Sequence, residues 1–238
     1  MRLKQITKIV VGLIIFFTLP TLLFFGFLYL RYDEDLPEVV NITEADEMAY
    51  KMLDALNYDA YKTTDIIEWS FKGIHQYKWY KSENRCHVFW DDIRVELDLK
   101  NRDNSKVFVA DNVYNGIEVN DYINKAESYF NNDSFWLVAP YKVFDAGTER
   151  GLVTTEDGST ALLVTYTKGG STPGDSYLWH LNEDGMPNSF QMWVSVIPIG
   201  GLKATWDQWT TTNSGAMLPT NHEILFLDIT LDNIKTSK

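Results

Sequence analysis

Histidine, cysteine and carboxylate side chains are the groups that could do chemistry in this chain, and their spacing indicates no familiar centre. The four histidines are His75, His87, His180 and His222, and they form no HxH, HxxxH or HExxH pair of the kind that builds a metal site on one element. The single cysteine, Cys86, can form neither an internal disulfide nor a cysteine zinc cluster. We therefore expect no metal and no cofactor.

Nucleophilic catalysis is not indicated either. Cys86 precedes His87 in an alternating segment, and neighbouring side chains of a strand point to opposite faces, so a buried, inert thiol is expected. The chain contains no GxSxG serine elbow and no glycine-rich phosphate loop. A glycosidase pair could be drawn from distant strands of a chain with 33 acidic residues. We expect a protein that is not an enzyme, and a carbohydrate-active enzyme is the less favoured alternative.

Aromatic side chains are the most informative group. All eight tryptophans follow residue 60, and rings recur at every second residue in several segments. Alternation places one set of rings on inward faces, and this set is the candidate lining of an apolar cavity: Trp69, Phe71, Tyr77, Trp79, Tyr177, Trp179 and Trp193. Such rings either fill a core or surround a hydrophobic ligand, and the two alternatives differ in the empty volume that they enclose.

The elements that must position these rings are short strands with helices between them. Two-residue periodicity and turn residues predict antiparallel strands at 66–71, 75–80, 86–90, 94–100, 106–111, 159–168, 175–181, 189–196, 202–211 and 221–231. Helical spacing predicts an amphipathic helix from Thr43, as N-cap, to about Asn57. A second helix is expected from near Asn120 to about Phe130, followed by an irregular stretch with a short helix around 134–138.

The first thirty residues read as a membrane anchor. No charge occurs from Ile9 to Leu30, and these 22 residues would span about 33 Å as a helix, enough for a hydrocarbon core. Arg2, Lys4 and Lys8 precede the run, so the positive-inside rule places residues 1–8 in the cytoplasm. The run is long for a cleaved signal peptide and lacks a small-x-small site. We expect an anchor at 9–30, a linker at 31–42 and one extracytoplasmic domain at 43–238, periplasmic or extracellular.

The charge distribution limits the partners of that domain. All 33 acidic residues and 18 of the 21 basic ones follow residue 30. An acidic domain without a basic stripe does not suit a nucleic-acid backbone, nor docking on anionic lipid headgroups through a polybasic face.

The order of these segments resembles a known superfamily. An amphipathic helix at 45–56, the sequence Asp59-Ala60-Tyr61 leading into the strand at 66–71, and a second meander containing the run from Asn182 to Pro187 are similar to the periplasmic lipoprotein-sorting and lipid-carrier proteins (LolA/LolB-like). The resemblance implies an incomplete barrel, a strongly curved antiparallel sheet whose concave apolar face is capped by helices and holds acyl chains.

Two departures from that superfamily shape the functional expectation. The chain keeps an anchor, unlike a soluble carrier, and no cysteine follows the apolar run, unlike a lipidated receptor. The fold class predicted is therefore mainly β (α+β), a curved sheet or incomplete barrel behind one transmembrane helix. The function predicted is binding of a lipid or other hydrophobic ligand next to the membrane. An interaction or assembly domain with a filled core and no ligand is the alternative.

Overall fold

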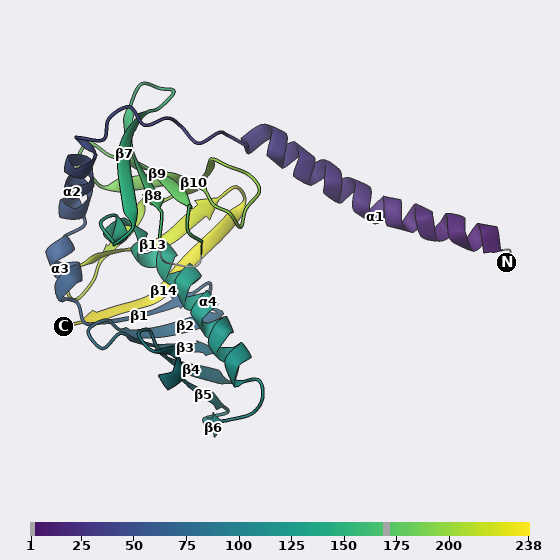
Figure 1. Ribbon diagram of the computed structural model, residues 1–238, viewed down its shortest axis with the longest axis horizontal. Coiled ribbons are helices and arrows are strands. Elements are labelled where there is room, and N and C mark those ends of the chain that lie inside the picture. Colours follow the sequence, from purple (N-terminus) through teal and green to yellow (C-terminus); the bar gives the residue numbers. More distant parts are fainter. Residues whose placement is uncertain (1–2, 169–171) are drawn as a thin grey trace.

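The computed structural model describes residues 3–168 and 172–238 and consists of a long apolar helix and a β domain (Figure 1). Helix α1 (Leu3–Tyr32) projects from the domain, and its segment from Gln5 to Tyr32 is long and apolar enough to cross a membrane. A signal sequence can have the same length and apolar composition as a membrane span. The structure of the described residues therefore shows one apolar helix near the N-terminus and does not assign it to either class.

The domain is built on one antiparallel sheet of 14 strands that does not close into a barrel. Its order is β6-β5-β4-β3-β2-β1-β14-β13-β11-β10-β9-β8-β7, and β12 pairs with β13 outside this path. The strands are β1 (Ile66–Phe71), β2 (His75–Tyr80), β3 (Arg85–Trp90), β4 (Ile93–Asp98), β5 (Lys106–Val109), β6 (Asn112–Tyr114), β7 (Thr148–Thr154), β8 (Thr160–Tyr166), β9 (Ser176–Leu181), β10 (Pro187–Trp193), β11 (Leu202–Thr205), β12 (Gln208–Thr211), β13 (Met217–Ile224) and β14 (Leu227–Ser237). The predicted fold class is confirmed.

Some strands differ from the sequence prediction. The segment 202–211 divides into β11 and β12, and 221–231 divides into the ends of β13 and β14. The second division occurs at Leu225, which adopts a left-handed φ of 55°. Because this turn contains no glycine, proline or asparagine, nothing in its composition indicated it. Strand β7 was also not predicted, since it lies in the stretch expected to be irregular.

The helices of the domain are α2 (Ala45–Ala55), α3 (Tyr58–Thr63) and α4 (Val119–Val138), with 3₁₀ turns η1 (Arg102–Asn104) and η2 (Ala139–Lys142). Helix α4 lies against the concave face of the sheet, and α2 packs against β7 and β8. Thr43 is not the N-cap of α2 as predicted. Glu44 occupies that position, and the backbone N–H of Glu44 donates to Asn41 Oδ1.

Helix α4 is longer than predicted. It runs without a break through the residues expected to be irregular, because its buried stripe continues past Phe130 through Asp133, Ser134 and Leu137. The charged residue in this stripe hid the helical period from the sequence. Helix α4 contacts β3, β4 and β5 in the first half of the sheet (β1–β6) and β13 in the second half (β7–β14). Inward side chains of both halves join it in one continuous core.

Residues 33–42, here called the juxtamembrane segment, bind to the domain where a linker was expected. The segment begins at the loop between β10 and β11, where the N–H of Glu34 donates to Gly200 O at 3.1 Å. It ends at the free edge of β7, where Val40 N–H donates to Leu152 O at 2.8 Å and Leu152 N–H donates to Asn41 O at 2.7 Å. These bonds satisfy part of an edge that an unclosed sheet leaves exposed.

Two glycines make room for this segment. A Cβ on Gly151 would lie 2.5 Å from Val39 Cγ1, and a Cβ on Gly200 would lie 2.5 Å from Glu34 O. Both distances are far below van der Waals contact, so only glycine permits the close approach of the two chains at these points.

We predict that Gly151→Ala displaces Val39 and loosens the juxtamembrane segment. Overpacking of this kind costs about 1–3 kcal/mol. Limited proteolysis of the full chain in detergent is expected to cut faster within residues 33–42. The double variant Val39→Ala with Gly151→Ala removes the methyl groups that collide, and it is expected to recover most of the protection. Equal cleavage of all three proteins would show that Gly151 has no such role.

Candidate functional site

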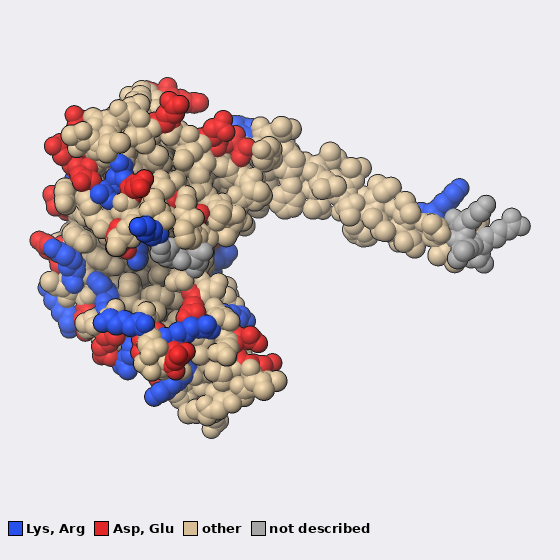
Figure 2. Space-filling view, in the orientation of Figure 1, with Lys and Arg blue, Asp and Glu red and all other residues tan. Residues whose placement is uncertain are grey.

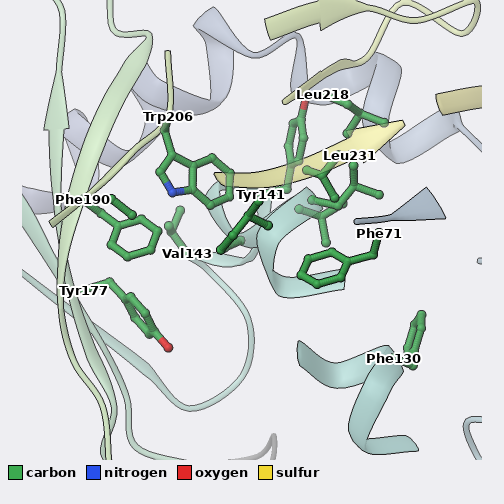
Figure 3. Close-up of a cluster of buried hydrophobic side chains, with 14 of the residues drawn as sticks. Phe71, Phe130, Tyr141, Val143, Tyr177, Phe190, Trp206, Leu218 and Leu231 are labelled. Carbon is green, nitrogen blue, oxygen red and sulfur yellow. The ribbon is translucent and has the colours of Figure 1, made fainter. Parts of the chain in front are cut away.

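The concave face under α4 brings together six of the seven rings predicted from the sequence. Trp69, Phe71, Tyr77, Tyr177 and Trp179 are buried in the common core, and Trp79 is partly buried against it. The rings come from both halves of the sheet, and Figure 3 shows side chains of the two halves converging around η2 and α4. Alternation in single strands therefore placed these six rings on the inward face, as the core contacts have it.

The six rings form two groups around different parts of α4. In the first half, Trp69 stacks on Tyr77 at 4.4 Å, and Trp79 meets Phe130 of α4 edge to face at 5.4 Å. In the second half, the Tyr177 ring lies 4.6 Å from Phe135 of α4. The predicted set left out further buried rings, which are Tyr61, Trp90, Phe130, Tyr141, Phe190 and Trp206. It also left out the partly buried Phe135 and Trp136, because this end of α4 was expected to be largely irregular.

Trp193 lies on the opposite face of the sheet, which corrects its predicted position. It packs beside a small outer cluster that includes Val153 and Leu178, and its Nε1–H donates to Glu34 O at 2.8 Å. Strand β10 alternates regularly there, with Phe190 and Met192 in the core and Trp193 facing out. The ring therefore binds the juxtamembrane segment, which covers the outer face and which no pattern in the sequence indicated.

Two hollows found among the described residues also lie on this outer face. One, of about 450 Å³, is lined by residues that include Val39, Gly151 and Leu163. The other, of about 550 Å³, is lined by residues that include Pro37 and Trp193. Both follow the course of the juxtamembrane segment, and neither is lined by any of the six inward rings.

A buried polar cluster interrupts the apolar concave face. The Asp133 side chain is only 2% exposed, and its Oδ2 lies 2.7 Å from His75 Nδ1 and accepts a 2.5 Å hydrogen bond from the Tyr77 hydroxyl. The His75 ring also stacks on Tyr129 of α4 at 3.8 Å. Burial, together with the neighbouring carboxylate, raises the pKa of Tyr77 far above its usual range, so Tyr77 remains a donor. We call Asp133, His75 and Tyr77 the Asp133 cluster.

The Asp133 cluster fixes α4 to β2. A buried carboxylate is costly unless it is paired and hydrogen-bonded. Here His75 and Tyr77 approach Asp133 Oδ2 from one strand, and Asn132 Nδ2 of α4 itself donates to Asp133 Oδ1 at 2.8 Å. The sequence contained a signal for it: His75 and Tyr77 share the inward face of β2, and Asp133 follows Phe130 by three residues on the buried stripe of α4. What the sequence did not contain was the pairing of that stripe with that strand.

His222 fixes the same helix to the second half of the sheet. Its side chain is fully buried in β13, with Nε2 2.7 Å from Trp136 O of α4 and Nδ1 2.8 Å from Thr205 O. A neutral imidazole carries one N–H and can donate to only one of the two carbonyls. Burial disfavours the charged ring and lowers the pKa of His222 to about 4, although both carbonyl acceptors favour the protonated form.

Cys86 lies on the inward face of β3 and is buried as expected. Burial raises the pKa of its thiol well above the usual range, so the group stays protonated and unreactive. The neighbouring His87 is half-buried and pairs ring to ring with Tyr80 and Phe89.

We predict that Asp133→Ala destabilises the fold by about 3–5 kcal/mol, because it leaves His75 and Tyr77 without their buried partner. Denaturant unfolding of the full chain in detergent, followed by tryptophan fluorescence, measures the change. Asp121→Ala, on the exposed side of the same helix, is the matched control and is expected to cost less than about 1 kcal/mol. Similar values for the two variants would show that the Asp133 cluster does not hold the helix.

We predict that the fold loses stability as His222 is forced to take up a proton. The unfolded chain binds this proton near the ordinary pKa of 6.5 and the folded chain only near 4, so the contribution is complete above pH 6.5. It is lost as the pH falls toward 4, by about 3 kcal/mol. In His222→Gln, which stays neutral, the free energy of unfolding is expected to fall less over this range than in the wild type. His87→Gln serves as the control at a half-buried site, and equal pH slopes in the wild type and His222→Gln would contradict the assignment.

Comparisons with known proteins give a distant structural neighbour. No family model matches the chain, and no curated protein matches it. A solved structure of a DUF1329 family protein from Desulfovibrio piger is similar to it at 11% sequence identity and a TM-score of 0.40. The match covers 83% of this chain and 93% of the other. The chain is thus similar to that protein only at the level of a distant neighbour.

Proposed function

We propose that this chain is a membrane-anchored, non-catalytic protein that binds the acyl chain of a lipid, or another hydrophobic molecule, on the concave face of its sheet. In this proposal α1 spans the membrane with its N-terminus in the cytoplasm, and the β domain lies on the periplasmic or extracellular side. Arg2, Lys4 and Lys8 before the apolar run, and the acidic residues that follow it, support this orientation.

The observation that carries the proposal is an unclosed sheet whose concave face is aromatic and is spanned by α4. Four of the six inward rings come from the neighbouring strands β1 and β2, and the other two come from β9, which is distant from them in the sheet order. The two groups meet α4 at separate positions. Each methylene group of a ligand buried against such a surface contributes about 0.8 kcal/mol. A chain of ordinary acyl length therefore has enough binding energy to compete with part of the contacts of α4.

The shape of the domain supports access from the membrane. Figure 2 shows an indentation of the molecule between the two halves of the sheet, on the side from which α1 projects. The same view shows α1 without charged side chains along most of its length. A lipid that leaves the bilayer beside α1 would meet this indentation first.

A filled core without a ligand is the second candidate, and one observation favours it. The inward rings pack on one another, with Trp179 at 5.2 Å from Phe190 and 5.0 Å from Trp206, and the two hollows lie on the outer face. In this alternative the domain would act through its surface, as an interaction or assembly module.

Photolabelling with lipid distinguishes the two candidates. The full chain is placed in vesicles that contain phosphatidylcholine with a diazirine at the end of one acyl chain, and adducts are mapped by mass spectrometry after illumination. Binding at the concave face predicts adducts on peptides that contain Trp69, Phe130 or Tyr177, and excess unlabelled lipid suppresses them. Adducts confined to α1 and exposed loops would reject ligand binding and favour the filled core.

The two α4 variants sharpen this experiment. Asp133→Ala frees α4 from β2, so we expect several-fold more adducts on the concave peptides at a temperature where the variant is still folded. Asp121→Ala changes the exposed side of α4 and is expected to label like the wild type. An equal rise in both variants would mean that labelling reports general loosening of the protein.

A further inference from the structure

We propose that the turn between β13 and β14 inserts into the same membrane leaflet as the C-terminal end of α1, so that the domain rests on the bilayer in one orientation. Leu225 and Phe226 form the turn, and together with Leu227, the first residue of β14, they are called here the apolar turn. This inference rests on the proposed membrane anchor, but it is independent of ligand binding at the concave face.

The apolar turn exposes three large hydrophobic side chains in succession. Leu225 is 40% exposed, Phe226 69% and Leu227 51%. Hairpin turns normally carry polar or glycine residues, and here the chain accepts a left-handed φ of 55° at Leu225. A contiguous apolar tip of this kind marks a surface that is covered in the working protein.

The position of the turn beside α1 identifies what covers it. The Phe226 ring lies 6.3 Å from the Phe24 ring of α1, and Figure 1 shows the β13–β14 hairpin reaching the side from which α1 leaves the domain. Phe24 precedes Leu30, the last residue of the uncharged run, by six positions, or about 9 Å along the helix. When α1 spans the membrane, the Phe226 ring therefore lies at a depth occupied by acyl chains.

Contacts between α1 and the domain hold this geometry. Leu28 of α1 is buried in the core of the domain. After α1, the N–H of Gly200 donates a hydrogen bond to Asp33 Oδ1 at 2.8 Å, and Gln191 Nε2 donates one to Glu34 Oε2 at 2.8 Å. The helix and the domain are thus joined at several points within a few residues of the membrane surface, and the apolar turn cannot swing freely away from α1.

The flanking charges limit how far the hairpin enters. Glu223 and Asp228 are cross-strand partners directly behind the apolar turn, so their two carboxylates follow the three apolar residues on both strands. Carboxylates at this position stay at the headgroup level, since burial of a charge in hydrocarbon is costly. The surface thus suits the apolar part of a zwitterionic leaflet, and anionic headgroups would be repelled.

Site-specific fluorescence in vesicles tests the inference. Cys86 is buried, so a maleimide NBD dye is expected to label only an introduced cysteine, and the unmodified chain provides the blank. Phe226→Cys, Phe16→Cys and Leu99→Cys are prepared in the full chain and placed in phosphatidylcholine vesicles. Phe16 lies within the uncharged run of α1, and Leu99 is an exposed apolar residue between β4 and β5. Quenching is measured with iodide in water and with nitroxide-labelled lipid in the bilayer.

Insertion predicts that the dye at position 226 behaves like the dye at position 16, with strong quenching by lipid nitroxide and several-fold weaker quenching by iodide than at position 99. If position 16 reports lipid while position 226 reports water, the inference is overturned and the anchor stands. If position 16 itself reports water, the proposed anchor fails, and the inference fails with it. Protection of position 226 from both quenchers would mean that a protein covers the turn, which also overturns insertion.

Discussion

Burial of the concave face is the constraint on which the rest of the structure depends. An antiparallel sheet that does not close leaves one apolar, ring-rich surface without a partner, and exposure of that surface would cost more free energy than a domain of this size has available. Helix α4 meets the requirement by crossing the face between the two halves, with Phe130 against the first half and Phe135 against the second.

Polar contacts then determine where α4 lies. Hydrophobic packing alone permits a helix to slide or rotate, because apolar contacts have little directional preference. Asp133 and His222 limit that freedom, because Asp133 reaches His75 and Tyr77, and His222 reaches Trp136 O, only when the helix occupies one position. The two groups bind the helix to different halves of the sheet. In the proposed function, the same two residues would govern how readily the concave face opens to a ligand.

The outer face is covered in a different way. Its buried apolar cluster is small, and the juxtamembrane segment, which has no helix and no strand, packs along it. The juxtamembrane segment crosses it from the β10–β11 loop to the edge of β7, with Trp193 and Gly151 at the points of closest approach. This arrangement gives the sheet a protected edge and joins the domain firmly to α1. It also brings the hairpin end with Phe226 beside Phe24, so the tether and the orientation of the domain share one set of contacts.

The sequence by itself determined what depends on local order along the chain. Two-residue alternation identified most strands and put Trp69, Tyr77 and Tyr177 on the inner face, and the uncharged run identified α1. Tertiary structure alone decided the rest, because it depends on which distant segments meet. An acidic residue at position 133 interrupts the apolar spacing of the helix, so the sequence did not indicate that α4 continues through it. The structure shows why it can, because His75 and Tyr77 bind Asp133. The Leu225–Phe226 turn looked like a continuous strand because its composition is that of a strand, and Trp193 looked inward because the segment that covers the outer face is distant in sequence. Local periodicity reports which face a side chain takes, whereas its partner is fixed only by the packing of the whole domain.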